Sequence, residues 1–175
     1  MLILDIEDVE LFDETTGSFI TIKGGTFRLE HSLEAIAKWE SKWKIPYLKA
    51  EYTPEQERDY YLTMSLDEGF TELHLTNRVL NEIVTYINDP HTATTITPSE
   101  SKESGKVITT EELYATMAIG QIPFECDKWN FNRLLMLIQI IGDKHAPKKK
   151  MTNQEIIEQN RKLNEERKKK YNTKG

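Results

Sequence analysis

The chain has 175 residues, of which 38% are hydrophobic and 30% are charged, and its net charge is −6. This length is enough for one domain with a substantial core, and no apolar run reaches the about 20 residues that a membrane-spanning helix needs. The single cysteine, Cys126, excludes an internal disulfide and a metal site built from several cysteines. The first ten residues are acidic and lack the basic start of a signal peptide, so we expect a cytoplasmic protein.

The charges are distributed unevenly along the chain. Residues 148–175 hold ten of the 23 basic and four of the 29 acidic residues, a net charge of +6, which leaves −12 for residues 1–147. An acidic body with a basic tail favours a protein partner, or contact between the tail of one subunit and the body of another. Nucleic acid is a less favourable partner because the acidic body repels phosphate.

The first 31 residues predict a small antiparallel β-sheet. Residues 19–23 and 26–31 are rich in β-branched and aromatic residues, which favour strands. The pair Gly24-Gly25 between them predicts a hairpin turn, and residues 13–18 predict a second turn. A sheet of two or three strands needs helices on one face to be stable, and helical patterns follow directly.

The first helix is expected to begin after Ser32 and to end before Pro46. Within it, Ile36, Trp39 and Trp43 follow one another at helical spacing and share one face. Two interpretations of the tryptophans remain open. They belong either to the hydrophobic core or to an aromatic patch that contacts a partner.

Three further helix starts carry capping signals. Thr53 with Gln56 and Thr109 with Glu112 match the capping-box pattern, and Thr76 opens a helix with a broad apolar stripe. Between the helices that are expected to begin at Thr76 and Thr109, residues 90–106 are rich in Thr, Ser and Pro and predict a mobile surface loop. The parts on either side of this loop are too small to stand alone, so we expect one domain.

Residues 129–142, WNFNRLLMLIQIIG, are the most apolar stretch of the chain. From residue 134 to 141 only Gln139 is polar. A buried parallel strand also gives a short apolar run, but Asp127 as N-cap and Gly142 as C-terminal cap favour a helix. A helix that is apolar on nearly all sides is expected at the centre of a core. The predicted fold is therefore α+β and mostly α, with a small N-terminal sheet followed by a helical bundle around this central helix.

Residues 148–175 predict a basic helical arm beyond a single domain formed by residues 1–147. Thr152 and Glu155 match a capping box, and the helix is expected to reach about Tyr171. Its apolar residues are too few to bury much of it, so we expect the arm to project into solvent or to dock on another chain.

No catalytic or metal-binding motif is present in the sequence. It lacks a phosphate-binding glycine loop, the zinc motif HExxH and the nucleophile motif GxSxG, and its four histidines are scattered. We therefore expect no catalytic residues, no metal and no cofactor, and a protein that acts through partner binding. The candidate partner-binding residues are Trp39, Trp43, Phe124, Trp129, Ile156, Ile157, Leu163, Arg161, Arg167 and Lys168.

A resemblance to a known family rests on four stretches: HSLEAIAKWESKWKIPYL (31–48), YINDPHTATT (86–95), IPFECDKWNFNRLLMLI (122–138) and KKMTNQEIIEQNRKLNEERK (149–168). Together they resemble tail assembly chaperones from tailed bacteriophages of Gram-positive hosts. The resemblance implies a protein of the host cytoplasm that binds the tape measure protein. It further implies help for tail tube subunits that polymerise around that protein, and absence from the finished virion.

Two alternatives remain open at the level of the sequence. The first is a structural protein of the virion, such as a tail or head–tail joining component, whose arm lies on a neighbouring subunit. The second is a regulator that binds nucleic acid through the basic tail. Self-association through the arm is compatible with the chaperone and with the structural protein.

Overall fold

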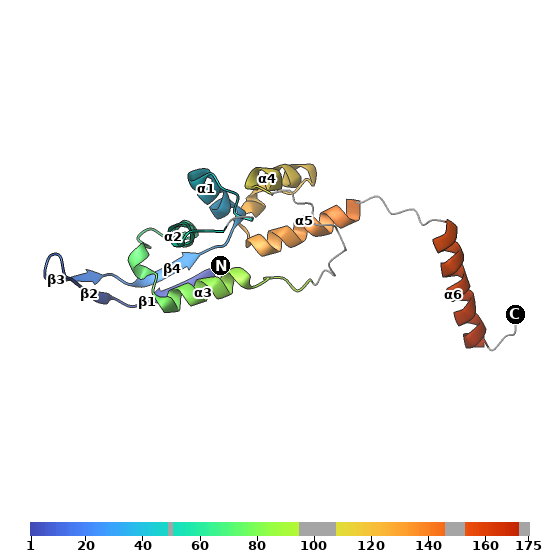
Figure 1. Cartoon of the computed structure of the whole chain (residues 1–175), viewed down its shortest axis with the longest axis horizontal. Helices are drawn as coiled ribbons and strands as arrows, with labels where there is room; N and C mark the ends of the chain where they lie inside the picture. The colour runs from blue at the N-terminus through green and yellow to red at the C-terminus, as the bar shows by residue number, and fades with distance from the viewer. Residues whose placement is uncertain (49–50, 95–107, 146–152, 172–175) are drawn as a thin grey trace. The chain divides into compact units, whose positions relative to one another are not determined.

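The computed structural model describes residues 1–48, 51–94, 108–145 and 153–171 (Figure 1). The described chain is an α+β protein that is mostly helical, with a small N-terminal antiparallel sheet, as the sequence predicts. It forms two compact units, Met1–Asp143 and Lys144–Gly175, whereas we expected the arm to begin at residue 148. The expected mobile loop (90–106) lies outside the described residues from residue 95 onward.

The elements follow one another as four strands and then a series of helices. The strands are β1 (Leu2–Ile6), β2 (Val9–Asp13), β3 (Ser18–Ile22) and β4 (Gly25–Leu29). The α-helices are α1 (Leu33–Trp43), α2 (Pro54–Thr63), α3 (Asn77–Asn88), α4 (Thr110–Ile119), α5 (Phe131–His145) and α6 (Asn153–Tyr171). Two short 3₁₀ helices complete the described chain, η1 (Glu72–His74) and η2 (Phe124–Lys128).

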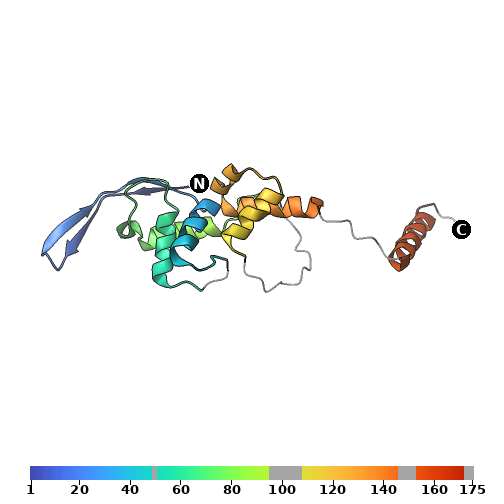
Figure 2. The same cartoon turned by 90° about the horizontal axis from the view of Figure 1, so that it is seen from above.

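The four strands form one long antiparallel hairpin with a bend in its middle (Figure 2). β1 pairs with β4 beside the helices, and β2 pairs with β3 farther out. The predicted turn at Gly24-Gly25 is wrong, because the chain reverses in the predicted second turn, where Gly17 has a φ of +64°. Gly24 lies at the bend instead, where an added Cβ would lie only 2.1 Å from the carbonyl oxygen of Ile6. The missing side chain thus permits a close approach of two backbone segments.

The hydrophobic core lies in the first unit, where the inner pair of strands meets the helices. α1 packs against α2 and α4, and α3 lies against β1. The most deeply buried side chains come from strands and helices alike: Leu4, Leu29, Leu33, Ile36, Trp39, Met64, Val79, Ile83, Met117 and Leu134. The inner sheet is therefore covered by helices, as a sheet of so few strands requires.

Three of the predicted helix caps, Ser32, Thr53 and Thr76, are confirmed. The side chain of Ser32 accepts a hydrogen bond from the N–H of Ala35 at the start of α1. Thr53 and Gln56 form the predicted capping box at the start of α2, and the side chain of Thr76 caps α3. These signals succeed because a cap depends only on residues within one helical turn.

The start of α4 is stabilised by a residue far away in the sequence. The side chain of Thr109, the predicted cap, makes no capping hydrogen bond there. Glu40, a buried residue of α1, accepts the N–H of Thr110 at 2.9 Å and its hydroxyl at 2.6 Å through Oε2. Its other oxygen accepts the N–H of Tyr47 at 2.7 Å. One carboxylate therefore joins α1, the segment that follows it and the first turn of α4.

The expectation of a fully buried central helix is wrong. In α5 only Phe131 and Leu134 are buried, while the following apolar residues are half-covered by the core. The helix begins later than predicted, after Asn130, whose Oδ1 accepts the N–H of Asn132, and Asp127 lies in η2. Gly142 lies inside the helix rather than after it. An apolar composition does not by itself specify how many sides of a helix are covered.

The second unit contains α6, a helix where one was predicted, while the predicted capping residue Thr152 lies outside the described residues. It ends at Tyr171, and in its described part Ile157 and Leu163 are exposed. The ion pairs Arg161–Glu165 and Lys162–Glu158 join residues four apart on its surface. Such pairs support a solvated helix, although each contributes only about 0.3–0.5 kcal/mol.

Candidate partner-binding site

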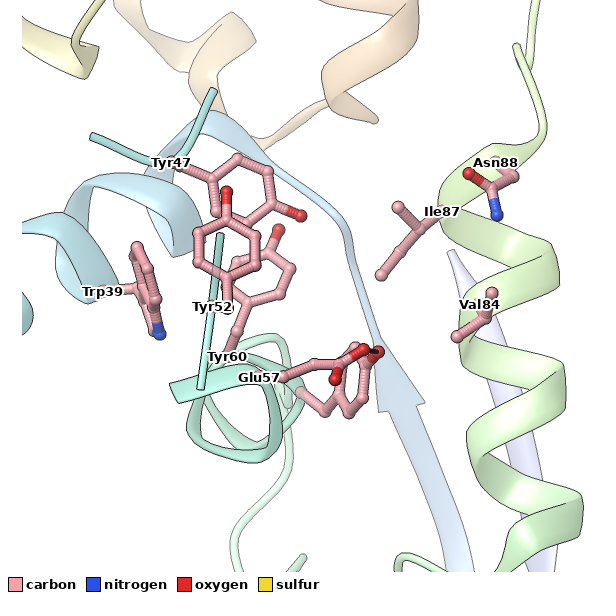
Figure 3. Close-up of a pocket in the computed structure, with 9 residues that line it drawn as sticks. Trp39, Tyr47, Tyr52, Glu57, Tyr60, Val84, Ile87 and Asn88 are labelled. Carbon is pink, nitrogen blue, oxygen red and sulfur yellow. Dashed lines mark hydrogen bonds between the residues drawn. The ribbon is translucent and has the colours of Figure 1, made fainter. Parts of the chain in front are cut away.

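An aromatic pocket opens on the surface of the first unit (Figure 3). Rings from α1, α2 and the segment between them form one wall, and Val84 and Ile87 of α3 point toward these rings from the other side. Its volume is about 180 Å³. The lining residues are Trp39, Tyr47, Tyr52, Glu57, Tyr60, Tyr61, Val84, Ile87 and Asn88.

Local contacts hold the rings of the pocket in place. The indole N–H of Trp39 donates to the carbonyl oxygen of Gln56 at 2.8 Å and so ties α1 to α2. The rings of Tyr47 and Tyr52 stack with centroids 5.5 Å apart, and those of Tyr47 and Tyr60 lie 4.6 Å apart. Aromatic pairs at such separations stabilise one another beyond the surface that they bury, so this wall is a preformed surface.

The aromatic wall carries little charge at neutral pH. Burial raises the pKa of Tyr47, Tyr60 and Tyr61, and it raises the pKa of Tyr52 to about 12. All four hydroxyls therefore stay protonated. Glu57 supplies the one carboxylate among the lining residues and accepts a hydrogen bond from the hydroxyl of Tyr61 at 2.5 Å.

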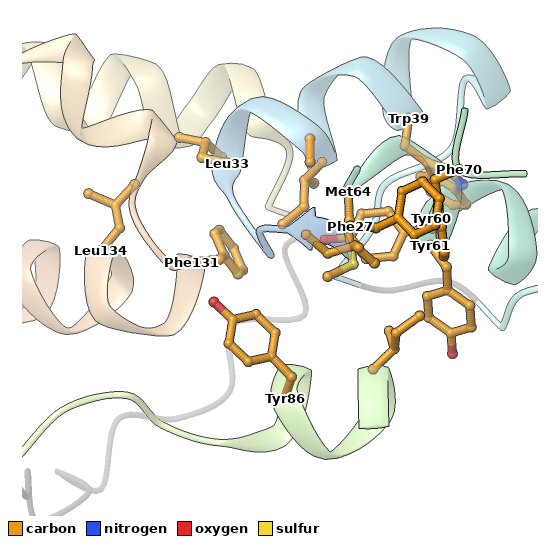
Figure 4. Close-up of a cluster of buried hydrophobic side chains, with 14 of the residues drawn as sticks. Phe27, Leu33, Trp39, Tyr60, Tyr61, Met64, Phe70, Tyr86, Phe131 and Leu134 are labelled. Carbon is orange, nitrogen blue, oxygen red and sulfur yellow. The ribbon is translucent and has the colours of Figure 1, made fainter. Parts of the chain in front are cut away.

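A buried histidine supports the pocket from behind. Nδ1 of His31 lies 2.5 Å from the hydroxyl of Tyr60, and its ring packs edge-on against Phe131. Tyr60 and Phe131 also belong to the hydrophobic cluster in Figure 4, so the pocket wall is continuous with the core. Burial, with a smaller contribution from His91, lowers the pKa of His31 to about 4.

This histidine predicts a loss of stability in mild acid. The unfolded chain binds a proton at His31 near pH 6.5, whereas the folded chain does so only near pH 4. Between these values the unfolded state binds more protons, so falling pH favours unfolding, by about 3 kcal/mol once pH 4 is reached. Urea unfolding at pH 7 and pH 4.5 measures the change. His31→Gln cannot titrate, so its stability should depend less on pH; an equal dependence in both proteins would contradict the assignment.

The pocket suits one side chain of a protein partner better than a small molecule. Pockets for drug-sized ligands have volumes of about 300–1,000 Å³, well above this one. Val84 on its rim is 41% exposed, so an apolar residue stands at the entrance. An apolar or aromatic side chain presented by a helix of the partner would contact both walls at once.

The structure places the predicted aromatic residues in different surroundings. Trp39 is only 1% exposed and belongs to both the core and the pocket wall. Trp43 is half-buried and donates its indole N–H to Asp59 at 2.7 Å. Phe124 and Trp129 are exposed and lie outside the pocket lining. Only the first of these four predicted residues therefore lines the pocket.

The predicted arm residues lie in the second unit. In its described part Ile157, Leu163, Arg161, Arg167 and Lys168 are exposed, while the side chain of Ile156 lies outside what the structure describes. The tyrosines and the α3 residues that complete the pocket were not predicted from the sequence. The density of aromatic residues between 43 and 61 was an available signal for the first of these groups.

The described residues contain no group of three or more His, Cys, Asp or Glu side chains arranged to hold a metal ion. In the same part of the chain, no helix combines the length and the apolar character required to cross a membrane. Comparison with protein-family models, with curated proteins and with solved structures finds no match for the chain.

Proposed function

We propose that this protein is a bacteriophage tail assembly chaperone that acts without catalysis in the host cytoplasm. The supporting observation is the preformed aromatic pocket, with Trp39 and Tyr60 on one wall and Val84 on the other. The resemblance noted in the sequence supplies the partner, the tape measure protein, with the tail tube protein as a second candidate.

The pocket chemistry suits the needs of such a chaperone. A tape measure protein is a long helical protein whose apolar stripes need cover before the tube surrounds them. An amphipathic helix docks in a groove through residues three and four positions apart. The pocket accepts one such anchor between its aromatic wall and Val84 of α3, which is exposed.

A charge at the pocket entrance is expected to weaken this binding. Val84→Glu places a carboxylate beside Glu57 and in the path of an apolar anchor, which should reduce affinity for the tape measure protein about tenfold. Co-expression of the two proteins, followed by affinity capture and measurement of soluble tape measure protein, tests this. Ile119→Glu changes an apolar residue that is 84% exposed and lies outside the pocket, so it serves as the matched control.

The possible outcomes distinguish an error in the assigned binding site from an error in the proposed function. Equal capture by both variants and the unchanged protein would remove the pocket from the proposal. Failure of the unchanged protein to bind or solubilise the tape measure protein would remove the chaperone function itself.

A structural protein of the virion is the second candidate. The outer part of the hairpin, which extends beyond the helices, favours it because such extensions interlock neighbouring subunits (Figure 1). Quantitative mass spectrometry of purified virions beside the infected-cell lysate separates the two candidates. A chaperone is abundant in the lysate and nearly absent from particles, whereas a structural protein is present in many copies per particle.

A further inference from the structure

The outer hairpin, formed by β2, β3 and the turn between them, contacts the rest of the first unit mainly at its inner end, where Ile22 is buried. Each of its strands pairs only with the other among the described residues. It extends beyond the helices in both views of the structure (Figure 2). A two-stranded hairpin without a covered face is at most marginally stable in water, and its free edges favour further contacts.

One face of this outer hairpin exposes a pair of aromatic rings. Phe12 and Phe19 lie opposite each other in the strand register, with ring centroids 5.2 Å apart. Their exposed fractions are 55% and 69%. The pair Glu10 and Thr21 shares this face, since opposite residues of an antiparallel pair point the same way and positions two apart repeat. The face therefore combines an apolar centre with a carboxylate beside it.

The hairpin is acidic, and the arm has the opposite charge. Residues 5–24 hold six acidic residues and one basic residue, Lys23, which pairs with Asp8. Residues 148–175 hold ten basic and four acidic residues. Such complementary charge steers two surfaces together and fixes their register.

One face of α6 matches the aromatic face in chemistry. Leu163 and Arg167 are four residues apart, so they lie on the same side of the helix, and both are exposed. Arg161 and Lys162 pair with glutamates of the same helix, so part of their charge is already compensated. The Leu163–Arg167 side thus offers one apolar and one basic contact to a partner.

We propose that α6 of one copy docks on the aromatic face of the outer hairpin of a second copy. Leu163 contacts Phe12 and Phe19, and Arg167 pairs with Glu10. Each copy carries one arm and one hairpin, so two copies can exchange arms in a closed dimer with two equivalent contacts. This inference is independent of the proposed function, because a chaperone or a structural subunit can self-associate in this way.

Charge exchange between the two surfaces tests the contact in the full-length protein. Glu10→Arg alone and Arg167→Glu alone should each weaken self-association about tenfold, as measured by sedimentation velocity over a range of concentrations. The double variant should restore it, because the opposite charges face each other again. Arg58→Glu changes an exposed arginine on α2 in the same direction as Arg167→Glu and should leave self-association unchanged.

Three results would overturn the proposal. The first is an unchanged protein that stays monomeric at every concentration. An arm that binds the hairpin of its own chain would give this result. Both single variants could associate as the unchanged protein does. The double variant could remain as weak as the single variants. Glu10 and Arg167 are both exposed, so circular dichroism should show that all variants retain the fold.

Discussion

Trp39→Ala is expected to lower the free energy of unfolding by about 3–5 kcal/mol. The side chain is 1% exposed and lies in the cluster of Figure 4. Its loss leaves a cavity among Tyr47, Tyr52 and Tyr60, whose rings all pack against the indole. The carbonyl oxygen of Gln56 also loses its hydrogen-bond donor. Urea unfolding followed by circular dichroism measures the change.

Trp43→Ala provides the matched comparison on the same helix. Trp43 is half-buried and donates to Asp59 at the surface, so its removal should destabilise the fold by only about 1–2 kcal/mol. Equal losses for the two variants would contradict the assignment of Trp39 to the core. Of these two tryptophans, only Trp39 lines the pocket, so Trp39→Ala should also weaken partner binding.

Glu40→Leu is expected to destabilise the protein by about 3 kcal/mol, although it replaces a buried charged residue by an apolar one. The substitution removes the acceptor of two backbone N–H groups and one hydroxyl, those of Tyr47 and Thr110. A buried donor that loses its acceptor bears the full cost of its desolvation. The loss should appear both in urea unfolding and as faster amide hydrogen exchange at the start of α4.

Glu34→Leu is the control for this prediction. Glu34 lies on the same helix, but its carboxylate pairs with Lys38 in a partly exposed ion pair. Its replacement should change stability by less than about 1 kcal/mol. If both variants lost the same stability, the hydrogen bonds of Glu40 would not be the source of its contribution.

The sequence predicts the helix starts well because each signal acts within one turn. Ser32, Thr53 and Thr76 all cap the helices that they were expected to open. Two helices are exceptions: α5 begins after Asn130 rather than after Asp127, and the first turn of α4 is stabilised by Glu40, 70 residues earlier in the chain. A carboxylate at such a distance leaves no local pattern, so sequence spacing could not reveal it.

Glycine and apolar patterns were less specific than the caps. Gly24-Gly25 fits the pattern of a hairpin turn. In the structure, the absence of a side chain at Gly24 lets the backbone of Ile6 approach closely, and this approach arises only when β1 pairs with β4. The apolar stretch from residue 134 to 141 predicts a helix correctly and its burial incorrectly. Burial depends on what covers each side of the helix, and that is a property of the packed structure.

The sequence by itself determined the class of the fold, the order of its elements and the separation of an acidic body from a basic arm, because propensity, capping and charge are local properties. Only the tertiary structure decided the surfaces available to partners. The pocket joins Trp39, Tyr60 and Val84 from three helices, and the aromatic face forms because Phe12 and Phe19 meet across two strands. Such sites depend on contacts between distant segments, which no spacing along the chain specifies.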